Sequence, residues 1–498
     1  MSGIEPGASN KRALTIRIAV VCAALSLLGI MTANPLLTVA GLAVVPMMFA
    51  LLWRPPEPPV LLFAASFQWL QVIMPVLTAD RDGVPLRGWA IETAAWLGLA
   101  TVVALAAGMR IGAGKRPLAD SDLLEMETRR LNVRRLAWAY FLSFFVGEAA
   151  LILGGFIPGL RQEFLSLVLL RWAVAFLVGW AALQRREFRL LAAIVIVTEV
   201  VLGFTGYFGG FKAILFLAIV LITGLGKRAR VFTKPALAIA CLAAIILASF
   251  WQVVKDDYRA VLSGGERAQV VRVPVTERLA FLFQQAGRTS FDDLRYGFNS
   301  ALDRIGYLDY FALTIETVPV RVPYQYGRLW REALVHVLTP RFFFPSKAEI
   351  NDSDRTREFT GVWAAGADEG TSISIGYAGE SYIDFGPIGM FVPIVLLGVF
   401  WGWSYRWLAT RTKARLFGLA VATNLLLGTA IYFEYSNIKL FGGALSSLIV
   451  LTVVLRYASD RMWRFVAPSS SPRPVVTTTH AAPTVAFGLA GGDSVRPS

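Results

Sequence analysis

Apolar blocks of about 20 residues recur along most of this chain. In hydrocarbon, every backbone N–H and C=O must find a partner within its own segment, so each such block predicts a membrane-spanning helix. Charged residues make up 16% of the chain and hydrophobic residues 56%, whereas a soluble domain is about a quarter charged. We therefore predict an all-α, polytopic membrane protein with about twelve transmembrane helices. The predicted spans are 13–32, 35–53, 59–78, 89–109, 136–157, 163–183, 190–206, 208–226, 235–254, 387–407, 415–433 and 438–457.

The net charge of +14 follows a topological pattern. Lys and Arg gather in alternate loops between the spans, chiefly at 110–135, 185–189, 227–234 and 406–415, while the short loops between these hold few. Cytoplasmic loops of membrane proteins carry such an excess. We therefore predict that both termini are cytoplasmic. Membrane lipids are the expected surroundings, and a nucleic-acid partner is not expected.

The spans and loops divide the chain into five parts. The one long loop, 255–386, falls on the outer face by the alternation of the spans and has ordinary polarity. The predicted parts are a cytoplasmic N-terminus at 1–12, a nine-helix transmembrane bundle at 13–254, a periplasmic loop at 255–386, a three-helix transmembrane bundle at 387–457 and a cytoplasmic, disordered tail at 458–498.

Two amphipathic helices are predicted within the long loop. Ser290 before an acidic pair reads as a helix start, and apolar residues then recur at helical spacing to Ile305. A second apolar stripe follows Arg328. These helices either lie on the outer membrane surface or form a self-packed cap, and the sequence leaves both open. The stretch 340–386 lacks a period and is predicted to be an ordered loop that carries the active-site residues.

Cysteine and histidine are scarce. Cys22 and Cys241 both fall within predicted spans, so no disulfide framework is expected. His336 and His480 are the only histidines, which leaves too few ligands for a zinc-type site. We expect no metal and no cofactor, and we expect His336 to lie at the membrane interface.

Two Asp-x-Asp strings offer the hard oxygen ligands that a divalent cation on a sugar diphosphate prefers. They are Asp80-Arg-Asp82, in an outer loop, and Asp352-Ser-Asp354. This pattern is common by chance, so neither string predicts a metal site.

Three charged residues fall near the middle of predicted spans: Glu148, Arg171 and Glu199. Counted from the outer turn between their spans, Glu148 and Arg171 lie at one depth, so we predict an ion pair. A structural clamp is favoured over an ion relay, because one paired cation is too little for a relay. Lys212 follows a glycine-rich turn near the outer face, where it either holds a phosphate or extends to the headgroups.

The densest polar run lies within 341–386 and contains the groups that glycosyl transfer at a lipid-linked diphosphate needs. Arg side chains stabilise a leaving diphosphate. A carboxylate deprotonates an acceptor hydroxyl, and aromatic rings pack on sugars. The run is Arg-Phe-Phe-Phe-Pro-Ser-Lys at 341–347, Asn-Asp-Ser-Asp-Arg at 351–355, Thr371-Ser372 and Gly-Glu-Ser-Tyr-Ile-Asp-Phe-Gly at 379–386.

The segments 341–347, Thr371-Ser372 and 379–386, the last leading directly into a span, resemble the bacterial oligosaccharide repeat-unit polymerases of O-antigen and exopolysaccharide (Wzy-type polymerases). The motifs cover roughly residues 300–400, and the turn Gly209-Gly-Phe-Lys212 is a further match. The resemblance implies a GT-C-like fold in the bacterial inner membrane. It also implies metal-independent transfer of a glycan from undecaprenyl diphosphate to another lipid-linked repeat unit on the periplasmic face.

The resemblance also implies roles for individual residues. Glu380 would be the base or would hold the acceptor sugar, with Asp384 second and Arg341 as a catalytic cation. The expected partners are a lipid-linked oligosaccharide, a chain-length regulator and a flippase. The predicted substrate-binding residues are Lys212, Arg328, Lys347, Arg355 and Tyr382.

Three other functions stay open. An O-antigen ligase-like transferase would rely on an outer histidine, for which His336 is the candidate. A transporter or flippase would show many polar residues within its spans and two related halves. A non-catalytic subunit of a polysaccharide export system is the third.

Overall fold

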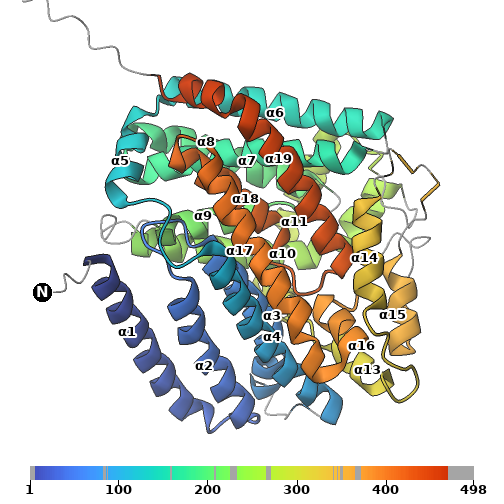
Figure 1. The fold of residues 1–498 in the computed structure, drawn as a ribbon. Helices are drawn as coiled ribbons and strands as arrows, with labels where there is room; N and C mark the ends of the chain where they lie inside the picture. The colour runs from blue at the N-terminus through green and yellow to red at the C-terminus, as the bar shows by residue number, and fades with distance from the viewer. Residues whose placement is uncertain are drawn as a thin grey trace, which may run out of the picture.

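Helices occupy all twelve of the predicted apolar blocks in the computed structural model (Figure 1). Ten of them are long and apolar enough to cross a membrane, so the chain is a multi-pass membrane protein. The two shorter ones are α9, Lys212–Gly224, and α18, Arg415–Thr429. The others are α1 Pro6–Gly29, α2 Pro35–Leu52, α3 Val60–Arg81, α4 Trp89–Ala113, α6 Val133–Phe156, α7 Arg161–Gln184, α8 Arg189–Thr205, α10 Thr233–Ser263, α17 Phe391–Arg411 and α19 Asn437–Val466.

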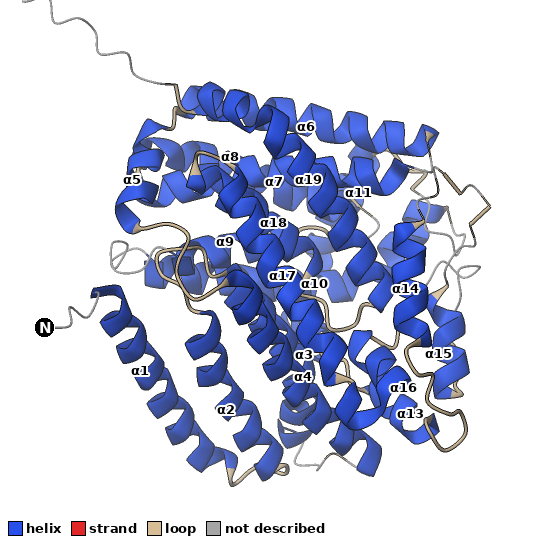
Figure 2. Ribbon diagram, viewed as in Figure 1, coloured by secondary structure: helices blue, strands red, loops and turns tan. Residues whose placement is uncertain are grey.

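The structure describes residues 6–81, 86, 88–157, 160–206, 209–224, 233–264, 271–339, 341, 343–344, 346–347, 351–364 and 372–468. Within these ranges the secondary structure is helical, with no strand (Figure 2). Short helices α5, Ser121–Arg130, and η2, Arg186–Phe188, lie between the long ones.

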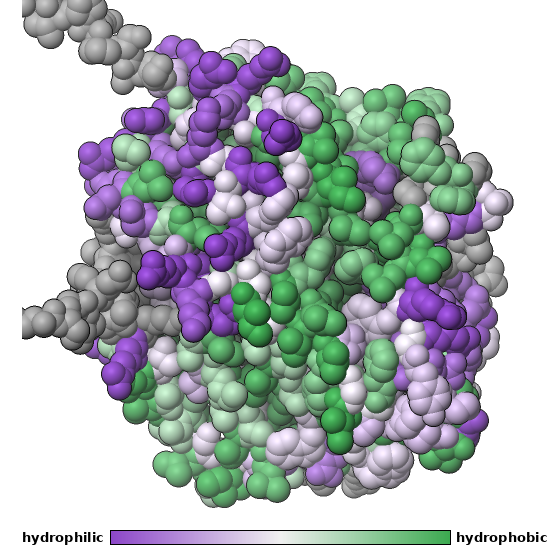
Figure 3. Space-filling view, in the orientation of Figure 1, coloured by the Kyte–Doolittle hydropathy of each residue, from purple (hydrophilic) through white to green (hydrophobic). Residues whose placement is uncertain are grey.

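The surface separates into an apolar band and two polar zones (Figure 3). Hydrophobic residues run diagonally across the molecule. Polar residues gather on one side, over α5 and the C-terminal end of α19, and on the other side over α14 and α15. Such a band between polar zones is the surface that a bilayer requires.

A glycine seam joins α4 to α17, which lie far apart in the sequence. Gly108 and Gly112 on α4 face Gly398 and Gly402 on α17. A Cβ atom added to any of the four would come within 2.1 to 2.4 Å of a backbone carbonyl oxygen of the other helix. Small residues spaced four apart allow helix backbones to approach this closely, and close packing is what drives helix association in lipid.

The long loop is more helical than its sequence indicates. The predicted helix after Ser290 is confirmed, with a capping box between Ser290 and Asp293, and so is the predicted helix after Arg328. The prediction that 340–386 is loop is wrong for α15 and α16. The helices of this region are α11 Val275–Arg288, α12 Phe291–Ile305, α13 Asp309–Thr317, α14 Arg328–Leu338, α15 Asp352–Thr360 and α16 Tyr377–Gly389.

The sequence of α16 hides its helix because its residues are buried all round. Eight consecutive residues, 377–384, are buried, so apolar residues do not recur on one face. Helical periodicity is visible only when one face of a helix is solvated. Gly386, at φ 71°, breaks the helix just before Pro387, and α17 then begins at Phe391.

The α12 helix packs against the transmembrane bundle. A Cβ atom on its Gly297 would lie 2.2 Å from the carbonyl oxygen of Ser249 in α10. This contact supports the cap alternative for α12. Phe291 and Tyr296 of the same helix are exposed.

Two predicted segments are more helical than expected. Helix α10 continues to Ser263, beyond the predicted span 235–254. Helix α19 continues to Val466, so residues 458–466 are helical and do not belong to a disordered tail. Both helices are longer than the bilayer requires, because their last turns are polar and stand outside the apolar span. The tail from 469 onward lies outside the described residues.

Candidate functional site

A buried carboxylate, Glu380, lies at the centre of the polar zone over α14, α15 and α16. It is in the first turn of α16 and is 1% exposed. Its Oε2 accepts a hydrogen bond from the Asn437 amide at 2.8 Å, and its Oε1 lies 3.5 Å from the Arg355 guanidinium. Burial raises the pKa of Glu380 to about 7, against the opposing effects of Arg355 and the Asn437 amide. The carboxyl group is therefore suited to exchange a proton near neutral pH.

Arg355 connects two carboxylates on neighbouring helices. From α15 it donates to Glu332 of α14 at 2.7 Å, and on its other side it reaches Glu380 of α16. Its side chain is mostly buried. Arg355 therefore holds three helices around one polar centre, and a planar guanidinium with several donors suits this role better than lysine does.

A second ion pair borders the same centre. Lys439, in the first turn of α19, lies 2.7 Å from buried Asp352, the first residue of α15. Its Nζ also donates to the Ser372 hydroxyl at 3.0 Å. Lys439 is exposed, so a cation at this place is accessible from the polar side.

Asp384 serves as the cap of a helix. It is fully buried, and its carboxylate accepts from the amides of Leu329 and Trp330 at 3.1 and 2.9 Å. Burial raises the pKa of Asp384, while these two hydrogen bonds oppose the rise. A carboxylate at a helix N-terminus satisfies otherwise orphaned amides. Asp384 is thus a positioning residue for α14, and its predicted role as a second catalytic group does not fit this geometry.

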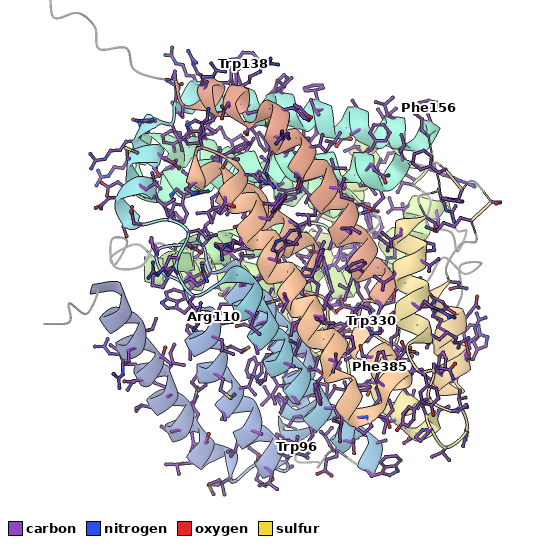
Figure 4. All side chains as sticks on the ribbon, viewed as in Figure 1. Trp96, Arg110, Trp138, Phe156, Trp330 and Phe385 are labelled. Atoms are coloured by element: carbon purple, nitrogen blue, oxygen red, sulfur yellow. The ribbon has the colours of Figure 1, made fainter. Side chains whose placement is uncertain are left out.

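Tyr382 is also a packing residue. It is buried, and its hydroxyl donates to the Val318 carbonyl at 3.2 Å. Its ring therefore offers no free face for a sugar, contrary to the prediction. The indole N–H of Trp330 donates to Ser381 at 3.0 Å and ties α14 to α16. Figure 4 labels Trp330 and Phe385 on these two helices.

The predicted cation Arg328 lies at the N-terminal end of α14. Its guanidinium is 2.8 Å from Glu358 of α15 and 5.6 Å from the centre of the Phe359 ring. This ion pair is partly exposed, so it contributes little to stability. Arg328 therefore borders the site without contacting Glu380.

The opposite end of α14 gathers Lys347, Arg341 and His336. Lys347 donates to the carbonyl of His336 and, at 2.9 Å, to that of Thr339, so it caps the helix C-terminus. Burial, together with the charges of Lys347, Arg341 and Arg355, lowers the pKa of His336 to about 4. His336 is therefore a neutral imidazole and a weak base.

Lys212 begins α9 and belongs to a separate group of charges. Its electrostatic partner is Glu434, in the loop between α18 and α19, and Arg304 of α12 acts on both. Glu434 accepts a hydrogen bond from the side-chain amide of Gln71 in α3. Burial raises the pKa of Glu434, against the effects of Gln71, Lys212 and Arg304.

The midspan charges form a cluster of three. The Nε of Arg171 lies 3.2 Å from Glu199, and its Nη1 lies 3.8 Å from Glu148. Glu199 is buried and also accepts from the Tyr140 hydroxyl at 2.7 Å, whereas Glu148 is half exposed. Glu148, the predicted partner of Arg171, is therefore present, but Glu199 lies nearer to Arg171.

Neither Asp-x-Asp string forms a metal site in the described chain. Asp80 accepts from the amide and side chain of Asn34, both at 2.8 Å, and so caps α2. Asp82 lies outside the described residues. Asp352 pairs with Lys439. In the residues that the structure describes, no three His, Cys, Asp or Glu side chains come together in a way that could hold a metal ion.

Sequence reasoning missed Glu434 and Asn437. Both lie in the segment Tyr-Phe-Glu-Tyr-Ser-Asn at 432–437, between the last two spans. A short loop between two spans gives no periodic signal. A carboxylate flanked by two tyrosines next to apolar spans was the only available clue.

The comparisons with known proteins give a family and no more. A family model described as a domain of unknown function (DUF8712) matches residues 103–465. No curated protein and no solved structure matches the chain.

Proposed function

The chain belongs to the DUF8712 family, and we propose that it polymerises oligosaccharide repeat units linked to undecaprenyl diphosphate into O-antigen or exopolysaccharide. The observation that carries this proposal is Glu380, a buried carboxylate whose pKa is raised to about 7 beside Arg355. Perturbed carboxylates with a specific charge partner are typical of functional sites.

In the proposed reaction, Glu380 acts as the base. Its ionised carboxylate takes the proton of an acceptor hydroxyl, and the hydroxyl oxygen forms a bond to the anomeric carbon of the donor glycan. The bond between that carbon and the diphosphate oxygen breaks, and undecaprenyl diphosphate leaves with both electrons. Arg355, which lies between Glu332 and Glu380, stabilises the carboxylate of Glu380 when it is ionised.

The proposed setting is the bacterial inner membrane, with twelve spans in a GT-C-like arrangement and both termini in the cytoplasm. The polar zone over α14 and α15 then faces the periplasm, where lipid-linked units are present. The basic residues around α5 support this orientation, since cytoplasmic loops carry the excess of Lys and Arg. A flippase and a chain-length regulator are the proposed partners.

The base role is tested with Glu380→Gln in a strain that lacks the chromosomal copy. The matched control is Glu358→Gln, which alters a half-exposed carboxylate of α15. We expect Glu380→Gln to reach normal abundance, to lose about 10² to 10⁴ in polymerisation rate and to accumulate single lipid-linked repeat units. The control should make long polymer.

Two outcomes would contradict the proposal. Wild-type polymer lengths with Glu380→Gln remove Glu380 as the base. A deletion strain that still makes long polymer on the lipid carrier, but fails to pass it to a further acceptor, identifies a ligase. In that case His336→Ala should be the severe variant.

A further inference from the structure

The side chain of Asn437 is buried and has no hydrogen-bond partner among the described residues. It is 1% exposed, and neither its Oδ1 nor its Nδ2 meets a protein donor or acceptor there. Its backbone amide, in contrast, donates to Glu380 at 2.8 Å. Buried side-chain amides are nearly always hydrogen-bonded, because desolvation without a partner costs free energy. Asn437 is therefore a polar group beside the proposed base whose side chain is not used by the fold.

A second unused oxygen belongs to Asp352. This residue is 2% exposed, and its Oδ2 lies 2.7 Å from the Nζ of Lys439. Its Oδ1 has no hydrogen-bond partner in the described part of the chain. A carboxylate oxygen accepts and cannot donate, so a partner for it must carry an N–H or O–H group.

A closed ring of contacts places both groups at the Glu380 carboxyl. Lys439, which pairs with Asp352, follows Asn437 by two residues in the first turn of α19. Asp352 and Arg355 are three residues apart on α15, where residues at this spacing are neighbours on one face. Arg355 lies 3.5 Å from Glu380, and the Asn437 amide completes the ring. Asn437 and Asp352 therefore border the proposed base together.

The unused groups suit a neutral ligand. Of the two cations in this ring, Arg355 already pairs with two carboxylates and Lys439 with one, so neither is left over for an anion. What remains is an amide, which both donates and accepts, and a carboxylate oxygen, which accepts. A hydroxyl group also donates and accepts. Two neighbouring hydroxyls of a sugar ring therefore match the amide and the carboxylate oxygen.

We propose that Asn437 and Asp352 bind two neighbouring hydroxyl groups of a sugar residue and so select the acceptor at Glu380. The Asn437 amide donates to one hydroxyl oxygen, and Oδ1 of Asp352 accepts from the other hydroxyl. Such a site rejects a sugar that lacks either hydroxyl, because that sugar leaves a buried group unpaired. Only the identity of the sugar as the acceptor rests on the proposed function.

The approach to the site passes Lys439. Its side chain is 40% exposed, and its Nζ donates to the exposed Ser372 hydroxyl at 3.0 Å as well as pairing with Asp352. Lysine is a flexible chain with a compact charge. Its ammonium group can therefore move into solvent and open the way to the buried groups.

Thermal unfolding of the purified full-length chain in phosphatidylcholine nanodiscs gives the first test. Asn437→Leu keeps the side-chain volume and removes two unpaired polar atoms, so the unfolding temperature should rise by about 1 to 3 °C. The matched control is Asn424→Leu in α18, whose buried amide already donates to the Ala420 carbonyl at 2.8 Å. The control should show no rise, because it loses a hydrogen bond that is made.

Saturation-transfer NMR on the same particles measures sugar binding. The probes are the methyl glycosides of glucose, galactose, mannose, rhamnose and N-acetylglucosamine, each with deoxy analogues that lack one ring hydroxyl. At least one glycoside should bind, and a matching deoxy analogue should bind about 10- to 100-fold more weakly. Asn437→Leu and Asp352→Asn should each weaken binding by a similar factor. The controls Asn424→Leu and Asp354→Asn, the latter at an exposed carboxylate of α15, should bind as wild type.

The contrary results are equally definite. A fall in the unfolding temperature of Asn437→Leu, or its failure to fold, shows that ordered water already satisfies the amide and removes Asn437 from the site. The site as a whole is overturned when no glycoside binds. It is also overturned when folded Asn437→Leu and Asp352→Asn bind the glycosides as wild type does.

The polymerase proposal can fail separately, because glycoside binding and unfolding need no turnover. Loss of kcat/KM for lipid-linked repeat units in Asn437→Leu identifies the bound sugar as the acceptor. Sugar binding by a protein that makes no polymer supports the site and overturns only that identification.

Discussion

The backbone amide of Asn437 donates to the carboxylate of Glu380 at 2.8 Å, which joins the first residue of α19 to the first turn of α16. A backbone amide has no rotatable side-chain bonds, so it fixes the position of the carboxylate more rigidly than a side-chain donor would. The remaining oxygen of Glu380 faces Arg355. The proposed base therefore depends on the last span of the protein as well as on its own helix.

The pH dependence of the polymerisation rate should follow the ionisation of Glu380. A base must be ionised, so the rate should rise with pH and reach half its maximum near pH 7, where burial places the pKa of this group. The rate is measured on purified protein with lipid-linked repeat units across this range. A rate that is independent of pH between the ordinary carboxylate pKa and neutrality would exclude Glu380 as the titrating base.

Stability should depend on pH in the opposite direction. The pKa of Glu380 is raised from 4.5 to about 7 in the folded chain. Between these values the folded chain holds a proton that the unfolded chain has released, so this stabilisation is present at low pH and is lost as the pH rises. Thermal unfolding in detergent should show the loss in wild type, and it should be smaller in Glu380→Gln.

Arg355 should affect the pH at which the rate is half-maximal more strongly than Arg341 does. Arg355 contacts Glu380, whereas the charge of Arg341 acts on His336 and Lys347 at the far end of α14. We expect Arg355→Gln to move the rate midpoint to higher pH, because a cation that favours the ionised carboxylate is gone. Arg341→Gln should leave that midpoint unchanged. Identical midpoints for both variants would show that Arg355 does not set the charge of the base.

Asp384→Asn should affect folding more than chemistry. The variant weakens the hydrogen bonds at the N-terminus of α14, and the loss of such a cap costs about 0.5 to 2 kcal/mol. The unfolding temperature should fall, while the turnover of the protein that remains folded should stay within a few-fold of wild type. A stable but inactive variant would restore Asp384 to the list of catalytic candidates.

Removal of Arg171, the cation of the midspan cluster, should destabilise the protein. Arg171→Leu leaves Glu199 buried without its cation, at a cost of about 3 to 5 kcal/mol, so the protein level should fall. Adding Glu199→Gln should restore the level, because the amide can still accept from Tyr140. Glu148→Gln alone should have little effect, since that side chain is half exposed. An abundant but inactive double variant would favour an ion relay.

The orientation of the chain can be tested with single cysteines. In a background without Cys22 and Cys241, Asp354→Cys on α15 should react with a membrane-impermeant thiol reagent in intact spheroplasts, because the side chain is exposed on the proposed periplasmic side. Arg129→Cys on α5 is the control and should react only after lysis. The reverse pattern would invert the topology and exclude a periplasmic active site.

The spans could be predicted because hydrocarbon imposes one solution on the backbone. The helices after Ser290 and Arg328 could be predicted because each has a solvated face. Helix α16 could not, since burial on all sides removes its periodicity. The pair of Arg355 and Glu380 depends on two helices meeting in space, and no spacing rule connects them.

The candidate residues show the same limit. Residue type marked Glu380 as a candidate, but it could not show that Asp384 and Tyr382 are held by hydrogen bonds within the fold. Glu434 was missed because the cations that act on it come from α9 and α12, which the sequence does not place next to the loop between α18 and α19.

The glycine seam between α4 and α17 has a consequence for biosynthesis. When α4 enters the membrane, Gly108 and Gly112 present bare backbone to lipid, because their partners Gly398 and Gly402 have not yet been translated. Helices α2 and α3 can pack on α4 at this stage, but the seam face of α4 stays uncovered until α17 emerges from the ribosome. A premature stop before residue 398 should therefore leave this face of α4 without its partner helix.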